Sequence, residues 1–427
     1  MSSRTFLFAH LADAHVGAWP RDPAVRQALR ESVLRALQVV DERDCAFLLI
    51  SGDLFHTPVP EPAEVAPVAA ALRRLVEHGR RIYVIYGSHD YVAHRTSWLD
   101  VLAETGLFLK AAPEAVRSEG TRWTLPFLVD PGTGAAIAGI SGRSHGLDRA
   151  YFRAVDSEAL RAHDGFRIFQ FHAAIDEYLP SHLREHIRGI SRADLPGGID
   201  YYAGGHIHYT YTGEGPEGGL LVNPGAVFGT SVTDIQYGVE DRTQQGVVIV
   251  QVTDGVPKAE FVRTAPREGI QVFDVDVDGR SAETAKEIVS KEIAAHARPG
   301  SLLFPRVRGT LADGRIGTLG LQESRDAADR QGAATVHWDL TEAAGAPLSD
   351  SPSGSEAAAE AETLEALGKE LGGRVPALAG ERGIEQLREL LRELGTAKGE
   401  GEARADYESA RVDTALRLLG LKRPAGA

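Results

Sequence analysis

Residues 6–15 read Phe-Leu-Phe-Ala-His-Leu-Ala-Asp-Ala-His, an apolar run that leads directly into two metal-type ligands. Four later stretches repeat this form, with strand-like residues before a polar end. The ends of the five stretches are Asp13 and His15, Asp53 and His56, residues 88–90, His172, and His206 with His208. Short apolar runs that alternate with helical spacing predict an α/β domain over residues 1–265.

The positions of these polar ends predict a common site. Ligands of α/β sheets gather at the carboxyl ends of the strands, so the five groups should meet. One such motif is common by chance, whereas five in series are not. We therefore expect a functional cluster and not five unrelated surface residues.

The residue types at these ends indicate two metal ions. The set holds two carboxylates and four imidazoles: Asp13, Asp53, His15, His172, His206 and His208. That is too many ligands for one tetrahedral ion and suits two octahedral ions bridged by Asp53. Two ions about 3.5–4 Å apart activate a shared water and hold a phosphate oxygen during phosphoester hydrolysis. Mn²⁺ fits this thiolate-free set best, and Zn²⁺, Fe²⁺ or Co²⁺ stay open.

Composition narrows the class of protein. The chain has 427 residues, of which 43% are hydrophobic and 25% charged, as in a globular protein of two or three domains. An apolar run such as residues 45–50 is far shorter than the roughly 20 residues of a membrane span. The N-terminus lacks a signal-peptide pattern, and the single cysteine, Cys45, excludes an intrachain disulfide. We expect a cytoplasmic protein with no membrane partner.

The net charge of −14 disfavours a protein that coats DNA by charge alone. A nucleic-acid partner would need a local patch, a metal site or a second subunit.

The rest of the chain predicts three further parts. Period-two alternation at 271–277, helical spacing at 281–296 and strand patterns at 302–309 and 334–338 predict a small α+β domain over residues 266–345. A Ser/Pro/Gly/Ala-rich start predicts a linker over 346–380. Residues 381–427 carry two amphipathic stripes, which either pack on the same chain or bind a partner as a helix-loop-helix.

Three motifs carry a family resemblance: residues 10–17, residues 52–56, and residues 201–208 followed by Asn223-Pro-Gly. They resemble the calcineurin-type metallophosphoesterase superfamily and, within it, the double-strand-break-repair nucleases of the Mre/SbcD type. The resemblance covers about residues 5–265. It implies a β-sandwich flanked by helices, in four αββα layers. It also implies a DNA-binding capping domain at 266–345 and a tail that binds an ATPase.

The same resemblance implies a role for each site residue. One ion would be held by Asp13, His15, Asp53 and His208, and the other by Asp53, Ser88, His172 and His206. His89 would be the catalytic histidine, or else a residue that orients a ligand. His56 would lie beside the DNA phosphate, or else be a buried structural histidine. Asp90 would support the site or be a solvated charge.

Residue 88 departs from the family pattern. The usual Gly-Asn-His-Asp/Glu is here Gly87-Ser88-His89-Asp90. A serine hydroxyl is shorter than an asparagine amide and a poorer neutral donor to a metal. We therefore expect the second ion to bind more weakly than the first.

The function that follows is a two-metal-dependent DNA nuclease, an exonuclease on duplex ends and an endonuclease on single strands. It would act in double-strand break repair with a coiled-coil ABC-type ATPase of the Rad/SbcC type. The helices expected at 22–43 and after Pro62 match the region where the family forms its homodimer. The alternatives are a phosphodiesterase or phosphatase of small phosphoesters, and a non-catalytic scaffold of the same complex.

Overall fold

The computed structural model describes residues 5–90, 96–112, 123–142, 148–181, 183–184, 187, 189–346, 364, 378, 380–394 and 404–419. Contacts within the chain divide it into two units, Met1–Ala344 and Gly345–Ala427. Most of the linker predicted at 346–380 lies outside the described residues.

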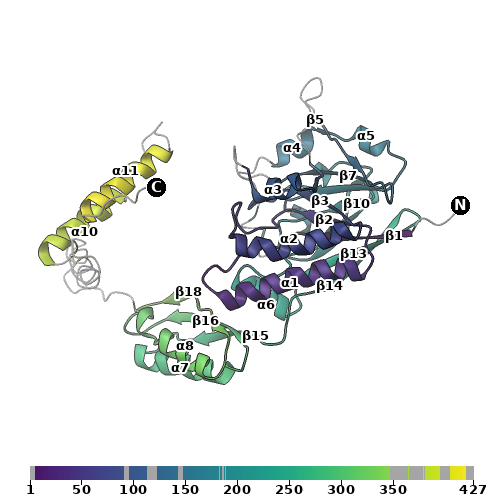
Figure 1. Cartoon of the computed structure of the whole chain (residues 1–427). Helices are drawn as coiled ribbons and strands as arrows, with labels where there is room; N and C mark the ends of the chain where they lie inside the picture. Colours follow the sequence, from purple (N-terminus) through teal and green to yellow (C-terminus); the bar gives the residue numbers. More distant parts are fainter. Residues whose placement is uncertain are drawn as a thin grey trace. The chain divides into compact units, whose positions relative to one another are not determined.

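The first sheet has six strands in the order β14-β13-β1-β2-β3-β4 (Figure 1). Its parallel part consists of β1 (Thr5–Leu11), β2 (Phe47–Ser51), β3 (Arg81–Ile85) and β4 (Leu109–Lys110). Two antiparallel strands complete it, β13 (Gly246–Thr253) and β14 (Val256–Arg263). The central strand β2 is buried along its whole length, which explains the apolar sequence of its first four residues.

The second sheet also has six strands, in the order β11-β12-β10-β9-β7-β6. Its parallel strands are β7 (Ala136–Ile140), β9 (Arg167–Phe171), β10 (Tyr201–Ala203) and β12 (Leu220–Asn223). The antiparallel edges are β6 (Leu128–Val129) and β11 (Tyr211–Glu214). A separate two-stranded sheet pairs β5 (Trp123–Thr124) with β8 (Val155–Asp156).

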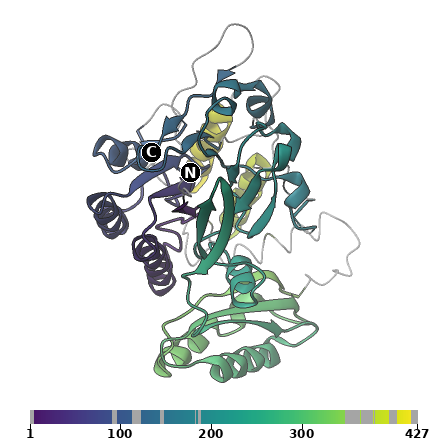
Figure 2. The same cartoon turned by 90° about the vertical axis from the view of Figure 1, so that its right-hand side faces the viewer.

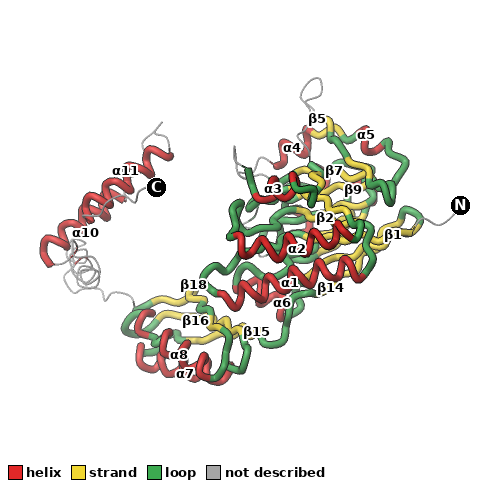
Figure 3. Tube along the Cα trace, in the orientation of Figure 1, coloured by secondary structure: helices red, strands yellow, loops and turns green. Residues whose placement is uncertain are grey.

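Helices pack on both sheets. Helices α1 (Pro23–Glu42), α2 (Pro62–Glu77), α3 (Trp98–Glu104) and α6 (Val232–Val239) share one buried apolar cluster with the first sheet. Figure 3 shows α1 and α2 lying along this sheet. Helices α4 (Asp148–Ala154) and α5 (Glu158–Arg161) pack on the second sheet. Phe8, Phe47 and Tyr201 lie in the core between the sheets. The prediction of an α/β fold with sheets flanked by helices is confirmed.

Short 3-10 turns join several of these elements. They are η1 (Asp176–Tyr178), η2 (Arg192–Asp194), η3 (Pro216–Gly218) and η4 (Ile316–Thr318). Cys45, two residues before β2, is buried, as the sequence predicted.

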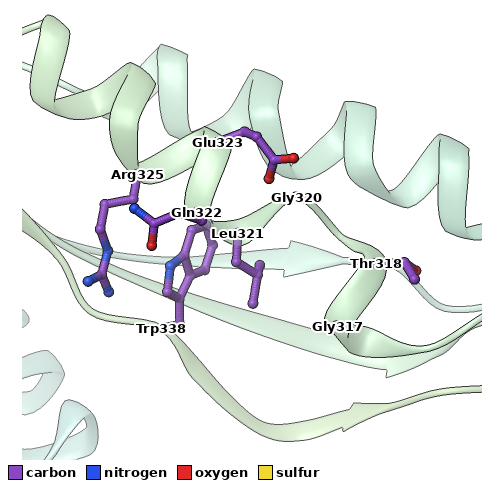
Figure 4. A pocket seen from close by; sticks show the side chains of 8 residues that line it. All are labelled: Gly317, Thr318, Gly320, Leu321, Gln322, Glu323, Arg325 and Trp338. Carbon is purple, nitrogen blue, oxygen red and sulfur yellow. The ribbon is translucent and has the colours of Figure 1, made fainter. Parts of the chain in front are cut away.

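A smaller sheet follows in the same unit. Its four parallel strands are β15 (Ile270–Asp276), β16 (Leu302–Thr310), β17 (Thr335–Val336) and β18 (Asp339–Ala344). Helices α7 (Ala282–His296) and α8 (Leu321–Arg330) pack against it through two small apolar clusters. A cavity of about 460 Å³ lies between the start of α8 and Trp338 (Figure 4). None of the predicted site residues lines that cavity.

The second unit contains two described helices, α10 (Gly380–Leu394) and α11 (Arg404–Leu419). Leu364, Leu378 and Leu387 form its buried apolar cluster, and Ile384 and Leu419 pack against them. Across the described residues, no helix combines the length and apolar character needed to span a membrane.

Candidate metal centre

The structure brings the five predicted strand ends together at one edge of the two sheets. Strands β1, β2 and β3 are neighbours in the first sheet, and β9 and β10 are neighbours in the second. Two hydrogen bonds join the sheets at this edge. His172 Nδ1 donates to the carbonyl oxygen of Ser51 at 2.8 Å, and the backbone N–H of His206 donates to Asp13 at 2.9 Å.

Three groups of three side chains offer ligand atoms within 4.8 Å of one another. Asp13, His15 and His208 form the first group, Asp13, Asp53 and His172 form the second, and His15, His56 and His89 form the third. Asp53 Oδ2 lies 3.1 Å from His172 Nε2 in the second group and 3.8 Å from His15 Nε2 in the first group. Asp13 is thus shared by these two groups, and Asp53 lies within 4 Å of a histidine from each.

The backbone is strained where these ligands stand. Asp13, His15, Asp53 and His206 have positive φ angles of 49°, 44°, 52° and 93°. Non-glycine residues rarely adopt this region, and such strain concentrates at functional sites. The surrounding structure holds these four residues in place against a local cost.

Gly87 allows the closest approach in this cluster. A Cβ atom at residue 87 would lie 2.1 Å from Asp53 Oδ1 and 2.4 Å from the Asp53 backbone nitrogen. Any larger residue would therefore displace Asp53. The glycine before Ser88 in the sequence motif has this packing role.

The imidazoles are arranged as ligands of a metal. The Nδ1 atom of His172 donates to Ser51, and that of His208 donates to Asp234 at 2.9 Å, which leaves Nε2 of both rings for the cluster. An acceptor that binds the other ring nitrogen of a metal-binding histidine fixes the orientation of that ring. His15 Nε2 lies 3.1 Å from His208 Nε2, and His15 Nδ1 is buried without a hydrogen-bond partner. This set of nitrogen and oxygen donors fits a pair of divalent cations.

Charges within the cluster perturb each other. Burial raises the pKa of Asp13 above its usual value, against the effect of His172 and His208. Burial opposes ionisation of Asp53, but His172 and His15 hold its pKa well below the usual range. Burial would lower the pKa of His172, whereas Asp53 raises it. Protons on these histidines occupy the place that cations would take, so metal binding would release them.

His89 and His56 lie beside the first group. His89 Nδ1 donates to the carbonyl oxygen of His56 at 2.8 Å, and the His89 backbone N–H donates to Asp53 Oδ1 at 2.7 Å. The His89 ring lies 4.8 Å from the His15 ring and stacks on His56 at 5.2 Å. Because a carbonyl only accepts, Nδ1 carries the hydrogen, and Nε2 of His89 is left for another partner.

Ser88 and His206 are both exposed and lie at the margin of the cluster. Ser88 Oγ donates to Asp53 Oδ2 at 3.2 Å. The His206 ring lies 5.1 Å from the His172 ring, but none of the three groups of closely spaced ligand atoms includes it.

Two carboxylates support the site from outside it. Asp90 is 1% exposed and accepts from the backbone N–H groups of Leu54, Phe55 and Gly87, so the alternative of a solvated charge is wrong. Burial, with Asp53 nearby, raises the pKa of Asp90 to about 7. Asp234, the partner of His208, was not identified from the sequence. Ser231-Val-Thr-Asp234 has the form of a helix-capping pattern, which indicates the start of a helix but not the contact with His208.

Comparison with known proteins agrees with this geometry. Residues 6–210 match the family model described as calcineurin-like phosphoesterase. Residues 6–210 form a calcineurin-like metallophosphoesterase domain. Sequence motifs and strand ends thus point to the same superfamily that the resemblance implied.

Several relatives of this chain bear a repair-protein name. It is 25% identical over 298 residues to the "DNA double-strand break repair protein Mre11" of Methanopyrus kandleri, and equally to that of Archaeoglobus fulgidus. These matches cover 66% and 65% of this chain but only 62% of the length of each relative. It is also 25% identical over 275 residues to the "Uncharacterized metallophosphoesterase YhaO" of Bacillus subtilis, covering 60% of each chain.

Proposed function

We propose that this metallophosphoesterase is a two-metal-dependent DNA nuclease, with exonuclease activity on duplex ends and endonuclease activity on single strands. The observation that carries the proposal is the pair of ligand groups that meet at one sheet edge, with Asp13 in both and Asp53 bordering both. The repair-protein name of the relatives supports DNA as the substrate. Action in double-strand break repair is part of the proposal.

Two divalent ions, with Mn²⁺ as the best fit, would be held by the residues of these groups. Asp13, His15, Asp53 and His208 would hold one ion, and Asp53, Ser88, His172 and His206 the other. Ions in such a pair supply an activated water and neutralise charge on the phosphate. The chain's own part is to fix the donors, through Ser51 behind His172 and Asp234 behind His208.

His89 would donate a proton to the leaving oxygen. Its Nδ1 is bound to the carbonyl oxygen of His56, so Nε2 would face the phosphate. The exposed position of His89 leaves it accessible to a substrate. His56, half-buried and stacked on His89, would lie beside the DNA backbone.

The remaining assignments follow the same proposal. Residues 266–345 would cap the DNA, and residues 381–427, beyond the linker at 346–380, would bind a coiled-coil ABC-type ATPase of the Rad/SbcC type. Helices α1 and α2 would form a homodimer interface in the cytoplasmic protein. An ATPase that clamps DNA would also offset the net charge of −14, which opposes DNA binding by this chain alone.

The test compares three substrates in parallel with Mn²⁺ or with EDTA. We expect Mn²⁺-dependent cleavage of end-labelled duplex DNA, of circular single-stranded DNA and of bis(p-nitrophenyl) phosphate. Asp53→Asn should abolish all three. Cleavage of the small ester alone would support a phosphodiesterase of small phosphoesters. Cleavage of none, with Mn²⁺ shown to be bound, would support a non-catalytic scaffold.

A further inference from the structure

Helix α6 lies between the metal cluster and the small sheet. Figures 1 and 2 both place it where the phosphoesterase sheets meet the small domain. Ile235 of α6 belongs to the same buried apolar cluster as Ile270 of β15 and Phe304 of β16. The helix therefore packs on both parts of the unit at once.

A residue at the N-terminal end of α6 positions the candidate metal ligand His208. Asp234 Oδ2 accepts from His208 Nδ1 at 2.9 Å, and from the backbone N–H groups of Thr230 and Ser231 at 3.1 Å each. Ser231 Oγ in turn accepts from the backbone N–H of Asp234 at 3.1 Å. One carboxylate thus caps the helix and fixes the ring of His208. A shift of this helix end would turn His208.

The next polar side chain of α6 contacts the small domain. Arg306 of β16 donates from Nη1 to the side-chain oxygen of Gln236, two residues after Asp234. The same guanidinium pairs with Asp274 of β15 at 2.8 Å. Arg306 therefore links the small sheet to the helix that orients His208.

We propose that α6 couples the small domain to the metal centre, with Asp234 as the positioning residue of His208 and the Arg306–Gln236 contact as its anchor. The inference rests on the proposed metal site, because it needs His208 to be a ligand. It adds that the affinity of the ion held by His208 depends on a contact of the small domain. A partner that moves the small domain would then alter this ion's affinity without touching a ligand.

The chain offers a matched control for the anchor. Arg308 lies two residues beyond Arg306 on β16 and also pairs with Asp274, at 3.1 Å, and with Glu342, at 3.2 Å. Both of these ion pairs lie within the small domain. Arg306→Ala should weaken the ion held by His208 about 3- to 10-fold, whereas Arg308→Ala should leave it unchanged. The measurement is Mn²⁺ binding to the full chain by titration calorimetry.

Gln236→Ala removes the same contact from the α6 side and guards against a folding defect in Arg306→Ala. The double variant should lose no more Mn²⁺ affinity than either single variant, since all three break one contact. Additive losses, or equal losses in Arg306→Ala and Arg308→Ala, would overturn the coupling.

The positioning role of Asp234 has its own control. Asp234→Ala should weaken this ion about 10- to 100-fold, and Asp234→Asn, which keeps an acceptor for His208, should recover part of the loss. Ser231→Ala damages the same helix cap but leaves the His208 contact in place, so its Mn²⁺ affinity should match the wild type. Equal losses of Mn²⁺ affinity in Asp234→Ala and Ser231→Ala would mean that Asp234 acts only by capping the helix.

The wild-type titration separates this inference from the proposed function. If the wild type and every variant bind two ions with the same affinities, the coupling is wrong and the proposed metal centre stands. If the wild type binds no Mn²⁺, both the coupling and the proposed metal centre are wrong.

Discussion

The carboxylate of Asp90 accepts a 3.1 Å hydrogen bond from the backbone N–H of Phe55, 35 residues earlier in the chain. The same carboxylate accepts from Leu54 and Gly87. It therefore joins the loop after β2, which carries Asp53, to the loop after β3, which carries His89. Together with the hydrogen bonds from the His89 backbone N–H and Ser88 Oγ to Asp53, this buried side chain holds the two loops at a fixed distance.

Replacement of Asp90 should separate these loops. Asp90→Ala leaves three N–H groups without their acceptor, which should cost about 2–4 kcal/mol of stability and most of the activity. Asp90→Asn keeps an acceptor and should lose less of both. Urea unfolding and Mn²⁺-dependent ester hydrolysis measure the two effects. Wild-type activity in Asp90→Ala would exclude a role in holding the site.

The metal centre illustrates what a sequence can and cannot predict. Asp13, Asp53 and His172 follow apolar runs directly, so sheet topology alone brings them together. The partner of His208 lies 26 residues further on, in a helix that sequence analysis did not identify. A contact between separate elements leaves no local signal, because its partners are set by packing. The short strands β4, β5 and β6 were missed for a similar reason: two residues carry no periodicity.

His89 and His208 should differ in what their loss removes. His89 hydrogen-bonds to the carbonyl of His56 through Nδ1 and would act on the leaving oxygen, so His89→Ala should abolish nuclease activity with metal binding nearly intact. His208→Ala should lose metal as well as activity, because its Nε2 lies within the first ligand group. Calorimetry with Mn²⁺ distinguishes them. Equal metal loss in both variants would argue against a catalytic role for His89.

We expect the second unit to be needed for binding the partner ATPase and not for phosphoester hydrolysis. Its described helices bury Leu387 among their own residues, and the ligands of the metal centre all lie in the first unit. Deletion from residue 380 onward should abolish co-purification with the ATPase and spare Mn²⁺-dependent hydrolysis of bis(p-nitrophenyl) phosphate. The full chain is the control. A truncated chain that still binds the ATPase would place the interface elsewhere.

Acid should weaken one ion pair close to the His89 loop. Burial would raise the pKa of Asp100, but Lys110 at 2.6 Å and the hydroxyl of Tyr86 hold it at about 2, below the ordinary 3.8. A lowered folded-state pKa adds stability above about pH 4, and this contribution is lost as the pH falls toward 2.

Asp100→Asn should therefore be less stable than the wild type by about 1 kcal/mol at pH 7, a value reduced for the partial exposure of the pair. The difference should shrink as the pH falls below 4. Urea unfolding at pH 7 and pH 3 measures it. A difference that is constant with pH would assign the loss to helix capping by Asp100 rather than to its charge.

The departure at residue 88 predicts an unequal pair of ions. Ser88 Oγ lies 3.2 Å from Asp53 Oδ2, and its short side chain is exposed at the margin of the cluster. An asparagine amide would reach further toward the ion that His172 binds. Ser88→Asn should therefore shift the Mn²⁺ activation curve to lower concentration by about 10-fold, with unchanged products, since two-metal chemistry requires the weaker ion.

Ser88→Ala is the matched control, because it removes the hydroxyl and adds no ligand. If the hydroxyl contributes little, Ser88→Ala should follow the wild-type curve while Ser88→Asn moves to the left. A right shift in Ser88→Ala, together with no shift in Ser88→Asn, would mean that the serine already completes the second site. The difference from the family pattern would then have no effect on metal binding, because the serine hydroxyl would bind the ion in place of the asparagine amide.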